Sequence, residues 1–237
     1  MTWSIVARDP VSGAFGIAAA SRFFALGALV PWLKSGLGAA ATQAFINPML
    51  GQTTLGLLEI GEDAAEAVAA AVAADPGRAH RQLHAVDAYG RTGAFTGEAC
   101  VDWCGHVAGE GVSVAGNMLV DRVVVEHSLQ AYEAAADRPF AERLLAALQA
   151  GDAAGGDKRG RQSAVLAIHS TETYPELSIR VDDHADPINE LQRIYTKAQR
   201  DFVVFRQFIP TAENPAGITD RAALEEARKA WAQTREV

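Results

Sequence analysis

Two cysteines and a histidine form one compact group of potential metal ligands in this sequence. Cys100, Cys104 and His106 follow the pattern Cys-x3-Cys-x-His. Zinc sites favour cysteines separated by two residues and usually have a fourth ligand, so this spacing is weak evidence for a metal. Trp103 between the cysteines is typical of a packed strand end. A zinc-dependent enzyme built on these three residues is the least favoured of the functional alternatives.

The run Asp182-Asp183-His184 also combines metal-binding side chains. It precedes Asp186-Pro187, and acidic residues before a first-turn proline are typical of a helix start. A serine-nucleophile elbow of the Gly-x-Ser-x-Gly type is not present in the sequence. We therefore expect neither a metal nor a cofactor.

The elements that must position any site begin with two predicted hairpins. The first joins residues 3–8 to residues 14–20 through an Asp-Pro-Val-Ser-Gly turn, and the second joins 28–33 to 38–44 through Lys34-Ser35-Gly36. Runs that are apolar on both faces, such as Gly38 to Ala41, indicate strands buried between two layers.

Helix pairs and further strands follow. We expect helices over 49–60 and 62–74, strands over 80–88, 92–96, 103–108 and 111–115, helices over 119–136 and 139–150, strands over 162–169 and 177–181, and a helix over 187–207. This order argues against parallel βαβ units. It predicts an α+β fold, a four-layer α-β-β-α sandwich of two antiparallel sheets, over residues 1–207. Residues 208–237 would form an arm that docks on this body or makes an oligomer contact.

Composition and charge exclude several classes of partner. The formal net charge is -8, and the sequence has no long basic cluster, so nucleic acid is not expected. Apolar runs stay below the roughly 18 residues that a membrane helix needs. The first residues lack the basic region of a signal peptide. These features predict a cytoplasmic protein that binds no membrane.

Six spaced motifs resemble the DUF1028 family, a bacterial and archaeal family of unknown function that is grouped with the N-terminal-nucleophile (Ntn) hydrolases. The motifs are MTWSIVARDP (1–10), SRFFALG (21–27), ATQ (41–43), GH (105–106), GGDKRGRQSA (155–164) and VDDH (181–184). The resemblance covers residues 2–200 and implies the Ntn hydrolase-like sandwich. The segment beyond Phe208 carries no motif of this kind.

The resemblance implies a nucleophile at the start of the first strand. An Ntn hydrolase attacks with the side chain of its first residue and uses that residue's α-amine, with a pKa of about 8, as the base. Thr2 follows Met1, and a small residue at this position permits removal of the methionine. Thr2 is otherwise an ordinary β-branched strand residue. Ser4 has the same chemistry but would need a further cleavage.

The same arrangement implies partners on neighbouring elements. Lys34 on the second hairpin could lower a pKa as a nearby cation, although a solvated turn lysine is the commoner situation. Thr42 and Gln43 end the returning strand, where oxyanion donors lie. Ser21 and Arg22 end the second strand and are candidates for substrate contact.

Two later segments should reach the same rim. Asn117 follows a strand and could donate to an oxyanion. Asp157 in the glycine-rich loop could orient the amine of Thr2, and Arg159 could bind a substrate carboxylate bidentately. A structural loop in which Asp157 and Arg159 pair with each other is the alternative.

These assignments predict an amide hydrolase that acts on a small molecule or short peptide, with Thr2 as nucleophile. The positive charge of Arg22 and Arg159 favours a substrate that carries a carboxylate. The alternative is a non-catalytic binding or assembly protein that keeps the sandwich. The alanine-rich helices, the apolar helix over 49–60 and the long tail indicate a homodimer.

Overall fold

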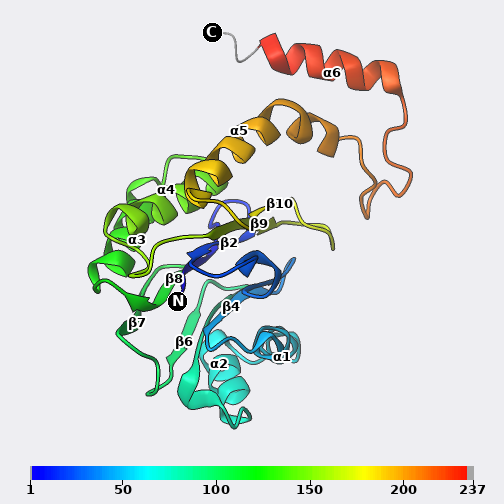
Figure 1. The fold of residues 1–237 in the computed structure, drawn as a ribbon. Coiled ribbons are helices and arrows are strands. Elements are labelled where there is room, and N and C mark those ends of the chain that lie inside the picture. Colours follow the sequence, from blue (N-terminus) through cyan, green and yellow to red (C-terminus); the bar gives the residue numbers. More distant parts are fainter. Residues whose placement is uncertain (1, 234–237) are drawn as a thin grey trace.

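Two antiparallel sheets packed face to face form the centre of the molecule (Figure 1). The computed structural model describes residues 2–233. The larger sheet has the order β10-β9-β2-β1-β8-β7, and the smaller one the order β3-β4-β5-β6. The strands are β1 (Thr2–Arg8), β2 (Phe15–Ser21), β3 (Pro31–Lys34), β4 (Gly38–Ala44), β5 (Arg81–Asp87), β6 (Thr92–Thr96), β7 (Trp103–Gly109), β8 (Val112–Leu119), β9 (Ser163–His169) and β10 (Leu177–Val181).

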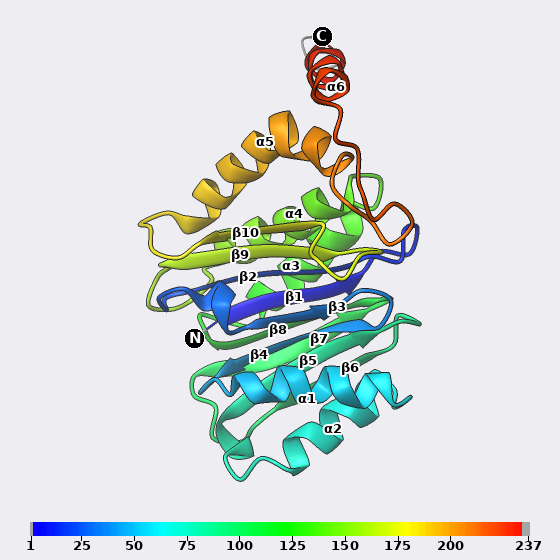
Figure 2. The same cartoon turned by 90° about the vertical axis from the view of Figure 1, so that its right-hand side faces the viewer.

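Helices cover the outer face of each sheet (Figure 2). α1 (Pro48–Glu59) and α2 (Ala64–Ala73) pack on the smaller sheet. α3 (Val123–Ala134), α4 (Phe140–Ala153) and α5 (Pro187–Arg206) pack on the larger one. The four-layer α+β sandwich expected from the sequence is confirmed. Within residues 2–233 no helix is long and apolar enough to cross a membrane.

The alternation of side chains along β1 sets the direction of its first residues. Trp3 and Ile5 belong to the core under α3 and α4, whereas Val6 belongs to the core between the sheets. Since side chains two residues apart share a face of a strand, Thr2 and Ser4 point into the inter-sheet layer with Val6. The nucleophile candidate is therefore directed toward the smaller sheet.

Three expected boundaries were wrong. The expected strand over 28–33 is a short 3-10 helix (Leu26–Ala28) followed by β3, because Pro31 begins the extended segment. The expected strand over 111–115 continues to Leu119, so Asn117 lies inside β8 and not in a loop. As a consequence, α3 begins at Val123 rather than at the strand end.

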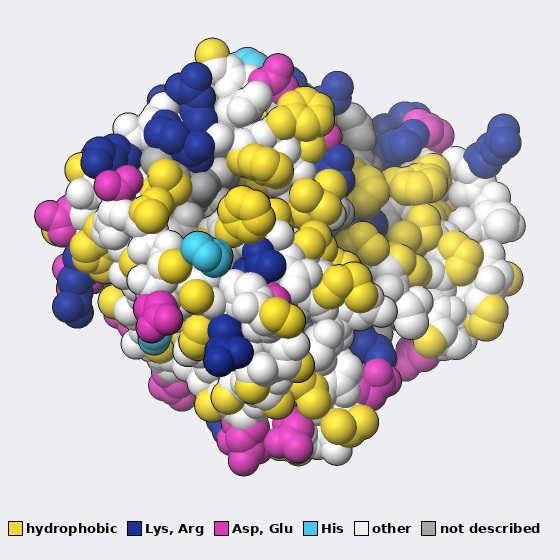
Figure 3. Space-filling model, turned by 60° about the horizontal axis from the view of Figure 1, so that its bottom comes forward, with side chains coloured by type: hydrophobic (Ala, Val, Ile, Leu, Met, Phe, Trp, Pro, Cys, Tyr) yellow, Lys and Arg dark blue, Asp and Glu magenta, His cyan; other side chains and the backbone are white. Residues whose placement is uncertain are grey.

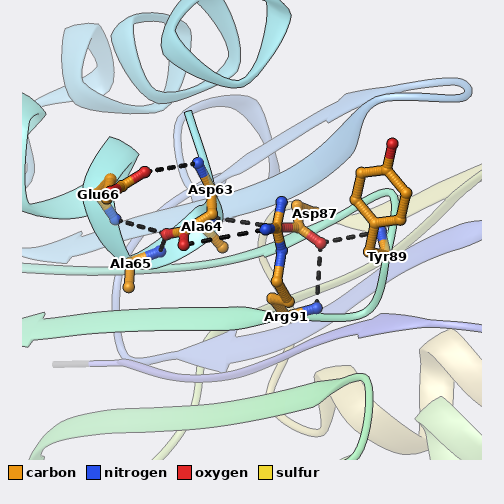
Figure 4. A network of polar contacts seen from close by, with 7 residues as sticks. All are labelled: Asp63, Ala64, Ala65, Glu66, Asp87, Tyr89 and Arg91. Atoms are coloured by element: carbon orange, nitrogen blue, oxygen red, sulfur yellow. Dashed lines mark hydrogen bonds and ion pairs between the residues drawn. The ribbon is translucent and has the colours of Figure 1, made fainter. Parts of the chain in front are cut away.

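The hairpin turns all lie at one end of the sandwich, which we call the turn end. At this end Asp87 accepts hydrogen bonds from the backbone of Ala64, Tyr89 and Arg91 and from the Arg91 guanidinium. Asp63 caps α2 beside it (Figure 4). The opposite end, where β1 begins, is the Thr2 end.

The C-terminal segment runs back along α5. α6 (Arg221–Gln233) contacts α5, and the Trp231 indole donates to the Gln199 carbonyl oxygen at 2.6 Å. The Tyr174 hydroxyl donates to the Pro210 carbonyl oxygen at 2.6 Å. Residues 208–233 thus contact the body through α5 and the β9–β10 turn. An oligomer contact through this arm stays a prediction, and residues 234–237 lie outside the described range.

Candidate functional site

Thr2 lies at the first position of β1, between strands β2 and β8. Its side-chain oxygen donates to the Ser21 hydroxyl at 3.2 Å, and its carbonyl oxygen accepts a bond from the Asn117 amide at 3.4 Å. Only 6% of Thr2 is exposed. The sheet therefore brings together Thr2, Ser21 and Asn117. The expected removal of Met1 concerns a residue outside the described range.

The Gln82 side chain is the centre of a buried polar network behind Thr2. Its amide oxygen accepts bonds from the amides of Gln43 at 2.8 Å and Asn117 at 3.0 Å. Its amide nitrogen lies within 3.1 Å of the Gly105 carbonyl oxygen and 2.8 Å of the Gly116 carbonyl oxygen. Gln82 thereby links the two sheets and fixes the Asn117 side chain beneath Thr2.

His84 continues this network toward Ser4. The Ser4 hydroxyl lies 2.7 Å from His84 Nε2 and donates to the Gln43 amide oxygen at 2.7 Å. His84 Nδ1 lies 3.0 Å from the Ser113 hydroxyl. Burial and the nearby His106 lower the pKa of His84 to about 3. The ring is therefore neutral, and its two nitrogens lie next to the Ser4 and Ser113 hydroxyls.

The sequence did not single out Gln82, His84 or Ser113. Part of their signal was present, because Ser113 is a polar residue in a mostly apolar strand, and Gln82 and His84 lie on the same face of β5, two residues apart. Such residues in a buried strand require hydrogen-bond partners. Which partners they find depends on the packing of the two sheets.

The glycine-rich loop crosses the end of β1. Asp157 forms a bridge with Leu119 at the end of β8, and its carboxylate accepts from the Arg22 backbone N–H at 2.9 Å at the end of β2. In the register of the sheet, Leu119 lies two positions beyond Asn117, the partner of Thr2. With a strand rise of about 3.4 Å per residue, Asp157 lies roughly 7 Å beyond Thr2 along the line of β1.

Two arginines flank Asp157. The Arg159 guanidinium donates to the Arg22 carbonyl oxygen at 3.2 Å and to Asp157 at 3.4 Å, and the Arg22 guanidinium donates to the Arg159 carbonyl oxygen at 2.7 Å. The side chain of Asp157 is fully buried, whereas 45% of the Arg159 side chain is exposed. The pairing that the structural-loop alternative expects is therefore present, and it keeps cationic groups at the rim beside Ser21.

Backbone conformations at this end are unusual. Among residues 2–233, the non-glycine residues with positive φ are Ala25, Ala44, Asp102 and Met118, with φ of 51°, 72°, 55° and 52°. All four lie in or next to the connections of the Thr2 end. Strained backbone of this kind is concentrated at functional sites.

Thr2 lines one of two neighbouring hollows. One of about 30 Å³ is lined by Thr2, Leu26, Val30, Gln43 and Ala44, among others. The second, of about 310 Å³, is lined by Ala44, Phe45, His80, Ala99, Cys100, Val101, Asn117 and Met118. Ala44 belongs to both, so the larger hollow begins beside the smaller one.

Several expected site residues lie elsewhere. Lys34 pairs with Gly38 at the turn end, six residues or about 20 Å along β4 from Ala44, and forms an exposed ion pair with Glu59. It is a solvated lysine and does not face Thr2. Thr42 points to the opposite face of β4, where its hydroxyl donates to the Asn47 carbonyl oxygen at 3.0 Å.

Gln43 and Asn117 are near Thr2 but are committed to internal bonds. Each is 1% exposed, and their amide nitrogens donate to Gln82. Asn117 also donates to the Thr2 carbonyl oxygen, so both of its protons are used. Neither side chain is directed at a substrate, and both hold the strands around Thr2 in place.

The cysteines do not assemble with other ligands. The Cys104 thiol lies 3.7 Å from the Cys100 carbonyl oxygen, and the Cys100 thiol 3.5 Å from the Arg81 carbonyl oxygen. Burial raises the pKa of both thiols. Within the described part of the chain, no three histidine, cysteine or acidic side chains form a group able to hold a metal ion.

Comparison with known proteins gives a family and a fold. A family model described as a family of unknown function, DUF1028, matches residues 2–191. A crystal structure of a protein from Silicibacter pomeroyi, described under the same family model, is 34% identical, covers 92% of this chain and 99% of its own, and superimposes with a TM-score of 0.86.

A second solved structure is Anbu, an ancestral β-subunit from Yersinia bercovieri. It is 13% identical, covers 86% of this chain and 97% of its own, and has a TM-score of 0.40. No curated protein sequence matches this chain.

Proposed function

The chain belongs to the DUF1028 family, and we propose that it is an Ntn-type amide hydrolase with Thr2 as its nucleophile after removal of Met1. The observation that carries the proposal is the position of Thr2. It begins the central strand β1, its hydroxyl points into the layer between the sheets beside Ser21, and it lines a hollow at the rim. An N-terminal threonine there would combine a hydroxyl and an amine on one residue.

In the proposed reaction, the Thr2 side-chain oxygen attacks the amide carbonyl carbon while its proton passes to the Thr2 α-amine. The tetrahedral intermediate then expels the amine product, which receives that proton, and leaves an ester on Thr2. Water attacks the ester in the second step, again losing a proton to the α-amine. The acid product leaves, and Thr2 regains its hydroxyl.

We assign the oxyanion donor to the backbone N–H of Ala44. The Thr42 N–H donates to Val30 on the β3 side, and the Phe45 N–H donates to His80 on the β5 side. Since N–H groups alternate along a strand, the Ala44 N–H points to the β3 side, where Thr2 shares a hollow with it. A backbone donor fixed by this geometry needs no reorganisation during the reaction.

Asp157 and Ser21 are proposed as positioning residues. The Asp157 carboxylate lies beyond Thr2 in the line of β1, close to the expected place of the α-amine, and its negative charge would favour the protonated amine between steps. The Ser21 hydroxyl accepts from Thr2 and would orient the attacking oxygen.

The second candidate function is a non-catalytic binding protein. It is favoured by the hydrogen bonds that Gln43 and Asn117 make within the protein, since their amides donate to Gln82 and to the Thr2 carbonyl oxygen. In this case the polar network would serve the fold alone, and a retained Met1 would be compatible with the function.

A covalent probe tests the catalytic proposal. An α′,β′-epoxyketone with a small apolar side chain consumes both the hydroxyl and the free amine of an N-terminal threonine as it closes a ring, and no atom is lost. We expect intact mass to increase by the full probe mass and peptide mapping to place the adduct on Thr2. Thr2→Ala should give no adduct, and the exposed Thr53→Ala should react like the unmodified chain. An unreactive protein, or an adduct on Cys100 only, would contradict the proposal.

A further inference from the structure

We propose that the site takes N-acyl amino acids, with the apolar acyl group in the larger hollow and the carboxylate of the leaving amino acid at Arg22 and Arg159. This inference rests on the proposed function and names its substrate class. It follows from what lies on either side of Thr2, because β1 has β8 as one neighbour and β2 as the other.

On the β8 side lies the hollow of about 310 Å³, a volume suited to a small ligand group. Apart from His80 and the committed amide of Asn117, its lining is apolar. Burial and then the neighbouring Cys104 raise the pKa of the Cys100 thiol, which keeps that thiol neutral. An uncharged acyl chain could displace water from this hollow without burying an unpaired charge.

One wall of the hollow is fixed in advance. Phe45 is 77% exposed, yet the Arg81 guanidinium lies 5.6 Å from its ring centroid and donates to its carbonyl oxygen. Arg81 is itself held by Asp75 at 2.9 Å. An exposed aromatic ring secured in this way loses little freedom when a ligand covers it.

Other large apolar side chains are exposed at the same end. They are Phe23, Phe24, Val101 and Val120. Figure 3 shows hydrophobic side chains gathered on the adjoining face, with lysine or arginine groups among them. Exposed apolar groups clustered beside a hollow are typical of a ligand-binding rim.

On the β2 side the groups at the strand end next to Thr2 carry a net positive charge. Arg22 and Arg159 flank one carboxylate, Asp157, which leaves one positive charge among these three side chains. Arginine is the side chain best suited to a carboxylate. Because the Arg159 side chain is 45% exposed, a leaving amino acid could depart to solvent while the more enclosed hollow retains the acyl group.

Equilibrium binding to Thr2→Ala, which cannot turn over, tests the inference without relying on catalysis. The probes are N-octanoylglycine, N-acetylglycine, which lacks the long chain, and octanamide, which lacks the carboxylate. We expect N-octanoylglycine to bind at least about tenfold more tightly than either of the others. Equal affinities for the three probes would overturn the inference.

Two further substitutions separate the subsites. Val101 is 54% exposed, and in Val101→Trp the larger side chain should fill the hollow. The affinity for N-octanoylglycine should then fall about tenfold, while the affinity for N-acetylglycine stays unchanged. Arg159→Gln should weaken the binding of the two probes that carry a carboxylate and leave the binding of octanamide unchanged. Arg159→Lys should restore part of the lost affinity. Val11→Trp and Arg138→Gln, at exposed positions of the turn end, are the controls. Unchanged binding in Val101→Trp would rule out the acyl subsite.

The outcomes distinguish the two proposals. If the chain retains Met1 and does not react with the epoxyketone but still binds N-octanoylglycine selectively, the proposed hydrolase activity is refuted and the proposed binding site is supported. A chain that reacts at Thr2 but does not prefer N-octanoylglycine would refute the substrate class alone.

Discussion

The two ends of the sandwich accommodate left-handed backbone in different ways. At the turn end, hairpin turns contain glycine at these positions: Gly13, Gly36, Gly90 and Gly111 have φ between 66° and 80°. Glycine adopts this conformation without steric cost. At the Thr2 end the glycine-rich loop also uses glycine, at Gly155, Gly156 and Gly160, but Ala25, Ala44, Asp102 and Met118 adopt this conformation there without it. Each such residue costs roughly 1–2 kcal/mol, so this end holds strain that the turn end avoids.

The difference indicates a division of labour. At the turn end, acidic side chains such as Asp87 accept bonds from backbone N–H groups (Figure 4), and glycines adopt the left-handed turns without strain. Polar side chains at the Thr2 end hold strands in a geometry that local preference disfavours. Proteins keep such strain where the surrounding structure enforces it, commonly at functional sites.

The largest stability effect is expected from Gln82→Leu. The substitution leaves the buried amides of Gln43 and Asn117 without their shared acceptor, which should lower the free energy of unfolding by about 3–5 kcal/mol. Urea denaturation measures this loss. Gln162→Leu, which removes one exposed bond to Asp183, should cost less than about 1 kcal/mol. Similar losses in the two variants would show that the network has no special role.

Asp87→Ala should destabilise the turn end without affecting the Thr2 end. Loss of its bonds to Ala64, Tyr89 and Arg91 should cost about 2–3 kcal/mol, whereas Asp63→Ala, which removes a helix cap, should cost about 1 kcal/mol. Both folded variants should form the epoxyketone adduct at the unmodified rate. A slower reaction in either would mean that the two ends are coupled.

Stability between pH 6.5 and 4 should depend on His84. Burial and His106 lower its pKa in the folded protein to about 3, from 6.5, so below pH 6.5 the unfolded chain binds more protons. The free energy of unfolding should therefore fall as the pH falls, by roughly 1 kcal/mol per pH unit from this residue. His84→Gln should remove this contribution to the pH dependence of the free energy of unfolding. His127→Gln, at an exposed position of α3, should leave the pH dependence unchanged. Equal slopes in all three proteins would contradict the assignment.

The smallest effects test the backbone comparison directly. Ala44→Gly should raise the free energy of unfolding by about 0.5–1 kcal/mol, because it relieves a left-handed alanine and removes only a methyl group. Gly36→Ala should lower it by about 1 kcal/mol, since a Cβ at Gly36 meets no atom within 4 Å and only the φ of 72° opposes it. Thermal unfolding of the pair provides the measurement. A stabilising Gly36→Ala would refute the comparison.

The sequence predicted the fold more fully than the site. Hairpin turns and helix pairs are local patterns, so the pairing of β1 with β2 and the start of α1 followed from residues such as Gly13 and Asn47-Pro48. The exceptions, β3 and the end of β8, lie where φ departs from local preference, at Ala25 and Met118. Tertiary packing decides such positions, and a single sequence does not show it.

The site depended on contacts between the sheets. Register and turn chemistry sufficed to expect Thr2, Ser21 and Asn117 at one rim. Register and turn chemistry did not show that the amides of Asn117 and Gln43 would donate to Gln82, or that Thr42 would face the helices. Lys34 was misplaced because a hairpin lysine can lie at either end of its strand, and the turn put it far from Thr2.

Intact mass of the untreated, purified protein tests the central claim most directly. The proposed reaction requires a chain that begins at Thr2, since only a free α-amine on that residue can serve as its base. We predict a mass that corresponds to loss of Met1, with an N-terminal peptide that starts Thr-Trp-Ser-Ile. A chain that retains Met1 throughout would contradict the account and would favour the binding protein.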